Sequence, residues 1–195
     1  MASCVSEIAG NIQLNCDSPI EGGYTGRAIL IPMSAHPVLT REASNPRIIS
    51  GIAIDQGAKV VFVDNEGANP FEGSGTTGNG ESGRTRFDKV ASLRMPERGA
   101  NFAKNVVEPL VKSGRGFIGI FEKVDRVGDG SFEIVGSQSP LKVTDPTTVT
   151  RQENANGGAW SANMQCTEDY AEVVLLKTDY DDTLDYFESL VAQSF

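Results

Sequence analysis

The sequence predicts an α+β fold that is mainly β, and three observations carry this prediction. Seven short segments have the apolar runs or the alternating pattern of strands. Gly accounts for 21 of the 195 residues, about 11% against a typical ~7%, which favours many turns. Two further segments place apolar residues at the spacing of an amphipathic helix. A chain of this length can bury roughly 70% of its unfolded surface, so we expect a single domain over 1–195.

In the N-terminal half, the strand-like runs are 27–33, 47–54, 58–63 and 84–95. The sequence Asp-Gln-Gly at 55–57 predicts a hairpin turn that pairs the second run with the third. The run 84–95 alternates charged with apolar residues over part of its length, which predicts a strand with one face in water.

In the C-terminal half, the runs 116–124 and 131–135 flank Val-Gly-Asp-Gly at 127–130, and this spacing predicts a second hairpin. A last strand is expected within 162–177, centred on the apolar residues 171–176. We find no internal repeat of 20–50 residues.

One helix is expected over 100–112, where Phe102, Val106 and Leu110 recur every four residues. Pro109 lacks an N–H group, so it should kink or end this helix just before its own position.

A second helix is expected over 180–192, capped by Thr178 or Asp179. Acidic residues near its start favour the positive end of the helix dipole. The apolar face that should pack on the sheet consists of Leu184, Phe187, Leu190 and Val191.

The interval 65–83 is exceptionally rich in Gly and polar residues, and intervals this long are functional or disordered. It contains little apolar material to offset an ordering cost of roughly 1–2 kcal/mol per backbone residue. We therefore expect a long hairpin loop that is mobile in a free subunit and becomes ordered against a neighbouring subunit.

The chain carries 17 basic and 26 acidic residues, a formal net charge of −9. This balance argues against nucleic-acid binding through bulk attraction and against docking on an anionic membrane. The start of the chain lacks the basic and apolar segments of a signal peptide, so folding in a cytoplasm is expected.

Cysteine and histidine usage indicates no reactive centre. Cys4, Cys16 and Cys166 lack the spacing of a disulfide framework or a zinc site, so reduced thiols are expected, with a Cys4–Cys16 bridge as the alternative. One histidine, His36, is too few for a three-histidine metal site. No catalytic residue, cofactor or metal ligand is predicted, and we expect no enzymatic activity; a scattered acidic active site is the alternative.

Other motifs favour structural interpretations. The segment 73–78 matches G-x-G-x-x-G, but a strand-like run follows it where a dinucleotide site needs a helix. The acidic group over 179–185 lacks the spacing of an EF-hand and is interpreted as the charged start of a helix. Trp160 is interpreted as a core or interface residue.

The order of elements resembles the tail-tube-like proteins of tailed bacteriophages. It runs from a strand at 60–64 through the Gly-rich loop to the strand at 84–95, then to a helix at 100–112 and another strand. The opening Ile-Gln-Leu-Asn-Cys at 12–16 and the later run Ile-Leu-Ile at 29–31 are similar to virion proteins of phages that infect Bacteroidota, crAss-like phages included. The resemblance implies a β-sandwich or barrel with a flanking helix and long loops that stack one ring on the next.

The resemblance further implies a non-enzymatic virion protein, assembled in the bacterial cytoplasm, whose rings form a channel for DNA. A hexamer is the expected ring, with other tail proteins as partners, no membrane and no specific DNA binding. The expected subunit contacts are Pro70 and Phe71 as apolar anchors and Arg84 and Arg86 as partners for acidic groups. The alternatives are a ligand- or glycan-binding β-domain and another ring component of the tail or neck.

Overall fold

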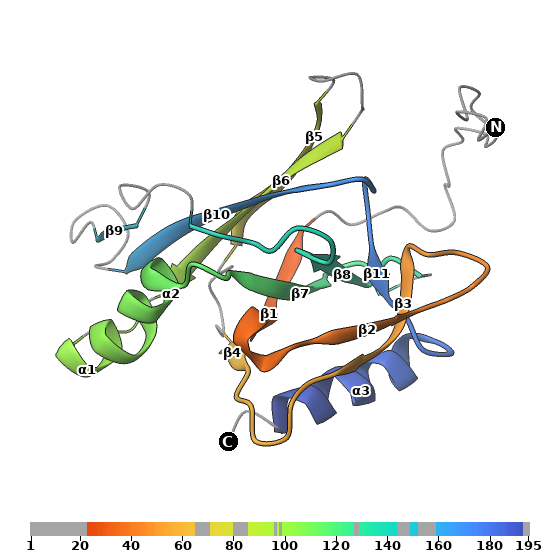
Figure 1. Ribbon diagram of the computed structural model, residues 1–195, viewed down its shortest axis with the longest axis horizontal. Coiled ribbons are helices and arrows are strands. Elements are labelled where there is room, and N and C mark those ends of the chain that lie inside the picture. Colours follow the sequence, from red (N-terminus) through yellow and green to blue (C-terminus); the bar gives the residue numbers. More distant parts are fainter. Residues whose placement is uncertain are drawn as a thin grey trace.

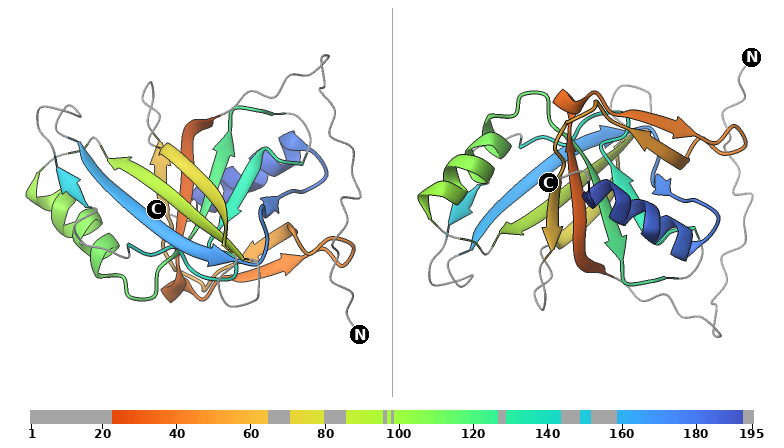
Figure 2. Two further views of the ribbon diagram at one scale, coloured as in Figure 1. Left: turned by 90° about the horizontal axis from the view of Figure 1, so that it is seen from above. Right: turned by 90° about the horizontal axis from the view of Figure 1, so that it is seen from below.

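A computed structural model describes residues 23–64, 71–79, 86–95, 97, 99–126, 129–143, 149–151 and 159–192. These residues form three layers (Figure 1). A four-stranded sheet, sheet B, packs on one face of a seven-stranded sheet, sheet A, and the helix α3 (Tyr180–Ala192) packs on the other face. The two views of Figure 2 show sheet B and α3 on opposite sides of sheet A. The predicted mainly β fold with a C-terminal helix is confirmed.

Sheet A is a mixed sheet with the order β2-β3-β11-β8-β7-β1-β4. Strands β3 and β11 run parallel, and the other neighbouring pairs are antiparallel. The predicted pairing of 116–124 with 131–135 is confirmed by β7 and β8. The strands are β1 (Tyr24–Pro32), β2 (Val38–Arg41), β3 (Ile48–Ala53), β4 (Val61–Asp64), β7 (Phe117–Lys123), β8 (Phe132–Val135) and β11 (Val174–Leu175), and the short 3-10 helix η1 (Met33–Ala35) follows β1.

The predicted hairpin between 47–54 and 58–63 is wrong. A turn does form, because the N–H of Ala58 donates to the carbonyl oxygen of Asp55 at 3.0 Å. However, β3 lies near one edge of sheet A, and β4 pairs with β1 at the opposite edge. At that edge the strand covers both cores, since Phe62 packs against the α3 side and Val63 against the sheet B side.

Sheet B is antiparallel, with the order β5-β6-β10-β9. Its strands are β5 (Phe71–Asn79), β6 (Arg86–Met95), β9 (Thr150–Arg151) and β10 (Trp160–Glu168). Two predictions are corrected here. Much of the interval expected as a loop is strand β5, because backbone pairing with β6 needs no apolar side chains. The long strand of the C-terminal part is β10, whereas the run expected over 171–176 holds only the two-residue strand β11.

The core between the sheets follows from the alternation of side chains along each strand. β1 contributes Ala28 and Leu30, whose exposed fractions are 0% and 2%. Opposite them lie Ala91 and Leu93 of β6 and Met164 of β10.

The core between sheet A and α3 is formed by those residues of sheet A whose side chains point away from sheet B. Ile29 and Ile31 of β1 alternate with the residues that face sheet B. Phe187 and Leu190 of α3 are buried against them, as predicted, while Leu184 and Val191 are half-buried at the rim of this core.

The helix expected over 100–112 is confirmed and has three joined parts. These are α1 (Ala100–Phe102), the π-helical turn η3 (Ala103–Val107) and α2 (Glu108–Lys112). Pro109 lies in the first turn of α2, directly after the π-helical turn. Such a turn lets the helix continue although the proline cannot donate an α-helical hydrogen bond. The helix is therefore locally irregular at Pro109 and does not end there.

The start of α3 is capped by Asp179, one of the two predicted caps. Its Oδ1 accepts a hydrogen bond from the N–H of Asp182 at 2.9 Å, and the Thr183 hydroxyl donates to the Asp179 carbonyl oxygen. The acidic cluster over 179–185 is therefore the start of a helix, as interpreted. No helix of the described part of the chain is long and apolar enough to cross a membrane.

The two sheets are joined at a corner formed by residues 141–142. Leu141 exchanges backbone hydrogen bonds of 2.8 and 2.9 Å with Phe117 of sheet A. The next residue, Lys142, exchanges backbone hydrogen bonds of 2.8 and 3.0 Å with Gln165 of sheet B. The chain reaches this corner after Gly136, whose φ of 92° is left-handed.

Candidate functional site

The outer face of sheet B is polar and forms the broadest candidate surface. On β6 and β10, buried residues alternate with residues that are exposed or half-buried. Hydroxyl and amide groups dominate this set, and two cross-strand hydrogen bonds of 2.8 Å link Ser92 to Asn163 and Thr167 to Asp88. No described helix or strand lies in front of this face in Figure 2 (left). The alternate positions are Asp88, Val90, Ser92, Arg94, Ser161, Asn163, Gln165 and Thr167.

Strand β5 forms one edge of sheet B. Among the described residues, no strand pairs with its far side. Its residues 71–79 read Phe-Glu-Gly-Ser-Gly-Thr-Thr-Gly-Asn, with Glu72 as the one charged residue and no proline. Charges and prolines are the usual devices that keep an edge strand from pairing with another chain, and the stretch 73–79 of this edge lacks both.

The four predicted contact residues do not form one patch. Pro70 and Arg84 lie outside the described residues. Phe71 is paired with Leu93 at one end of β5, whereas Arg86 is paired with Asn79 at the other end. The eight intervening steps correspond to about 26 Å of strand.

Arg86 already has an acidic partner in its own chain. Its Nε lies 3.0 Å from Asp169 Oδ1, and its second guanidinium contact is the carbonyl oxygen of Thr167 at 3.5 Å. This ion pair is exposed, so it leaves the arginine accessible at the end of the hairpin.

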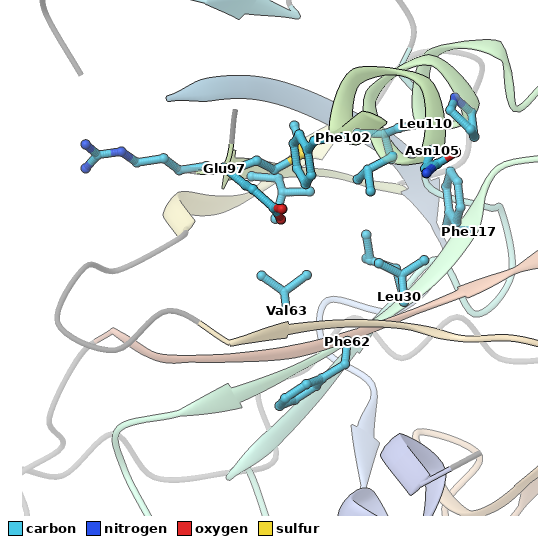
Figure 3. A pocket seen from close by; sticks show the side chains of 14 residues that line it. Leu30, Phe62, Val63, Glu97, Phe102, Asn105, Leu110 and Phe117 are labelled. Carbon is cyan, nitrogen blue, oxygen red and sulfur yellow. The ribbon is translucent and has the colours of Figure 1, made fainter. Parts of the chain in front are cut away.

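A pocket of about 310 Å³ lies beside the β4 edge of sheet A (Figure 3). It is enclosed by β1, β4, β6 and the helical segment α1–α2. Its floor and walls are apolar, and Glu97 and Asn105 contribute polar groups. In Figure 3 the Phe62 ring points away from the cavity, in agreement with its place in the core under α3. The principal apolar lining residues are Leu30, Val63, Leu93, Phe102, Leu110 and Phe117.

None of the motifs weighed in the sequence contributes a lining residue to this pocket. The glycines of 73–78 stand within strand β5, and the next described element is the strand β6, whereas a pyrophosphate site needs a helix N-terminus. His36 is exposed, with its Nδ1 2.6 Å from Asp55 Oδ2. Trp160 begins β10 and is half-buried, with the guanidinium of Arg151 6.0 Å from its ring. Within the described residues, no group of three or more potential metal ligands occurs.

A buried charged cluster is the feature that the sequence analysis missed. Lys89 was not singled out in the sequence, and its side chain lies in the core with an exposed fraction of 2%. The signal was present, because Lys89 has the same phase as Ala91, Leu93 and Met95, which are all buried.

Four further groups extend this cluster, from the buried Glu168 and Glu133 to the partly exposed Lys123 and Glu172. Lys89 Nζ lies 2.9 Å from Glu168 Oε2 and 4.0 Å from Glu133 Oε1. Glu133 Oε2 in turn lies 3.3 Å from Lys123 Nζ, which also binds Glu172. Burial lowers the pKa of Lys123, but the hydrogen bond to Glu172 and the neighbouring carboxylates outweigh it and raise this pKa overall.

A third buried carboxylate, Glu122, stands on the α3 side of sheet A. It accepts hydrogen bonds from Tyr180 at 2.8 Å and from Thr25 at 3.0 Å, and Arg27 lies 3.6 Å away. Burial and the bond to Glu122 raise the pKa of Tyr180 to about 12. This arrangement ties the start of α3 to the sheet.

We expect alkaline pH to destabilise the fold through Cys166. Burial, and secondarily the negative charge of Glu168, raise the pKa of this thiol to about 12. The unfolded chain loses the proton near pH 9 while the folded chain keeps it, so the free energy of unfolding falls between about pH 9 and 12, by at most ~1.4 kcal/mol per pH unit. Urea titrations at pH 8 and 10.5 should show a smaller fall for Cys166→Ala than for the wild type; equal falls would contradict this assignment.

The described fold is a three-layer arrangement of two sheets and a helix, with a polar open sheet on one side. No family model, curated protein or solved structure matches the chain.

Proposed function

We propose that this chain is a virion structural protein of tail-tube type, whose subunits assemble into rings that form a DNA-conducting channel. The observation that supports it best is the β5 edge of sheet B, with which no described strand pairs, next to a polar sheet face that no described helix or strand covers. The resemblance in element order points in the same direction. The sandwich of two sheets with a helical segment at its side is compatible with such a subunit.

The open edge supplies a physical route to a ring. Unpaired N–H and C=O groups of an edge strand can pair with a strand of another copy. A head-to-tail contact of this kind closes into a ring when its rotation permits, and a hexamer is the ring we propose. Phe71 of β5 and Arg86 of β6, at opposite ends of this strand pair, would then contact a neighbour at separate places.

The proposed channel face would let DNA pass without holding it. The face of sheet B offers hydroxyl and amide groups, and its charged positions on β6 and β10 are Arg86, Asp88 and Arg94, of which Arg86 is paired with Asp169. The chain as a whole carries a net charge of −9. A surface of this charge lacks the excess of cations that binds the phosphate backbone.

Shortening the β5–β6 hairpin tests the proposal. Replacement of 72–82 by a short turn removes most of β5, and we expect a folded monomer that no longer forms rings. Native mass spectrometry at micromolar concentration and negative-stain images measure the outcome. The matched control shortens the loop 42–46 between β2 and β3 of sheet A and should assemble normally. Undiminished assembly of the hairpin variant, or a wild type that stays monomeric or dimeric, would contradict the proposal.

The apolar pocket favours a second candidate, a non-catalytic ligand-binding β-domain. A volume of about 310 Å³ lies at the lower end of the range for small-molecule sites. In that case the wild type binds an apolar fluorescent probe such as anilinonaphthalene sulfonate, and Val106→Trp, which fills the pocket, reduces the affinity at least about tenfold. Val38→Trp, at an exposed position of β2, is the control and should bind normally. Absence of binding by the wild type would remove this candidate.

A further inference from the structure

The contact between Lys89 and Glu168 has the components of a bond-forming site. Both side chains are buried, with exposed fractions of 2% and 0%, and Nζ lies 2.9 Å from Oε2. Among the described residues, neither Nζ nor Oε2 has a partner in hydrogen-bond geometry. The two atoms are therefore in close contact without the alignment that a stable charged hydrogen bond prefers.

The other oxygen of Glu168 is held by two donors. Ser137 donates its hydroxyl hydrogen to Oε1 at 2.9 Å, and the backbone N–H of Gln138 donates to the same atom at 3.1 Å. Paired donors on one oxygen stabilise the negative charge that develops there when a nucleophile adds to the carbonyl carbon. The two oxygens of Glu168 are thus in different environments, one stabilised as an oxyanion and one facing the amine.

A base stands within reach of the amine. Glu133 Oε1 lies 4.0 Å from Lys89 Nζ. Its second oxygen accepts a hydrogen bond from Tyr24 Oη at 2.7 Å and faces Lys123 Nζ at 3.3 Å, so Oε1 is the oxygen turned toward the Lys89 amine. Glu133 is therefore available to take a proton from the attacking nitrogen.

We propose that Lys89 and Glu168 form an intramolecular amide bond after the chain has folded. Lys89 first transfers one proton to Glu168 Oε2, which leaves a neutral amine and a neutral acid. Nζ then adds to Cδ of Glu168, and Glu133 takes a second proton from the nitrogen. Glu133 returns that proton to the hydroxyl group at Cδ, the C–O bond breaks, and one water molecule leaves.

The fold favours amide formation in two ways. Groups held in contact react with effective concentrations that reach ~10⁵–10⁸ M in favourable cases. The reaction also removes two buried charges, whose desolvation is costly. The bond would link β6 to β10, the two central strands of sheet B, and it does not depend on the proposed function.

The mass of the intact, denatured chain tests the proposal. We expect the wild type to be lighter than its sequence mass by one water molecule, and a protease digest to contain a branched peptide that joins Lys89 to Glu168. Lys89→Arg should have the full sequence mass, and Glu133→Gln should form the bond at least about tenfold more slowly. The control Glu122→Gln, at the buried carboxylate on the α3 side of sheet A, should retain the bond.

If the variants fail to fold, the mass of the wild-type chain alone tests the proposal. A full sequence mass in freshly purified and in aged wild-type protein would overturn the proposal. A branch at Lys123 in place of Lys89 would also overturn it, because the chemistry would then belong to the neighbouring ion pair. Assembly is measured separately, so failure here is distinguishable from failure of the proposed function.

Discussion

Replacement of Phe187 by alanine should lower the free energy of unfolding by about 3–5 kcal/mol. Its ring is fully buried in the core between sheet A and α3. The ring centroid lies 5.3 Å from that of Phe132 and 6.5 Å from that of Phe62, and the Arg27 guanidinium lies 5.6 Å from it. Truncation leaves a cavity among partners on β4 and β8 that cannot all move inward.

Urea denaturation followed by circular dichroism measures this loss. Asp185→Ala, on the exposed side of the same helix, is the control and should change the free energy of unfolding by no more than about 0.5 kcal/mol. A Phe187→Ala effect as small as that of the control would mean that α3 does not pack on sheet A in solution.

Gly136→Ala should lower the free energy of unfolding by about 3–5 kcal/mol, at the upper end of single-residue effects. The glycine has a φ of 92°, a backbone angle that residues with a side chain rarely adopt. An added Cβ would lie 2.6 Å from the carbonyl oxygen of Phe117 and 3.0 Å from the backbone nitrogen of Leu141. Both atoms belong to the corner that joins the two sheets, so relief of the clash must disturb that corner.

Gly57→Ala separates the two contributions to this loss of stability, which are the strain of a left-handed backbone and the clash of the added methyl group. Gly57 also has a left-handed φ, 77°, but an added Cβ there meets no atom within 4 Å. It should therefore show only the backbone strain, about 1 kcal/mol. Thermal or urea unfolding of both variants gives the comparison, and equal losses would show that the corner yields to the additional methyl group.

Elements with local signals were predictable from the sequence. The helix α3 has apolar residues at helical spacing and a capping Asp179, and both features act within a few residues of each other. The pairing of β7 with β8 depends on a short connection rich in Gly. Strand β10 was also readable, since Ala-Asn-Met-Gln-Cys-Thr at 162–167 alternates strictly between apolar and polar residues.

Strand pairing over long distances was not predictable in the same way. The turn at Asp55 forms, yet β4 lies at one edge of sheet A and β3 lies next to the opposite edge. The reason is that β4 pairs with β1, while β3 pairs with the preceding β2 and the distant β11. β5 is rich in Gly and has hardly any side-chain signal for a strand. Its structure depends on the ladder that β6 offers, which no local pattern describes.

For the candidate site too, some features were predictable from the sequence and others were not. The sequence by itself determined the mainly β composition, the two helices, the net charge and the Gly-rich interval where we looked for function, since these depend on local pattern and on counts. Only the tertiary structure decided that this interval contains an edge strand, that an apolar pocket opens beside β4, and that Lys89 meets Glu168 and Glu133. Such meetings join strands far apart in the chain, and their geometry is set by how two sheets pack, which spacing along one strand does not encode.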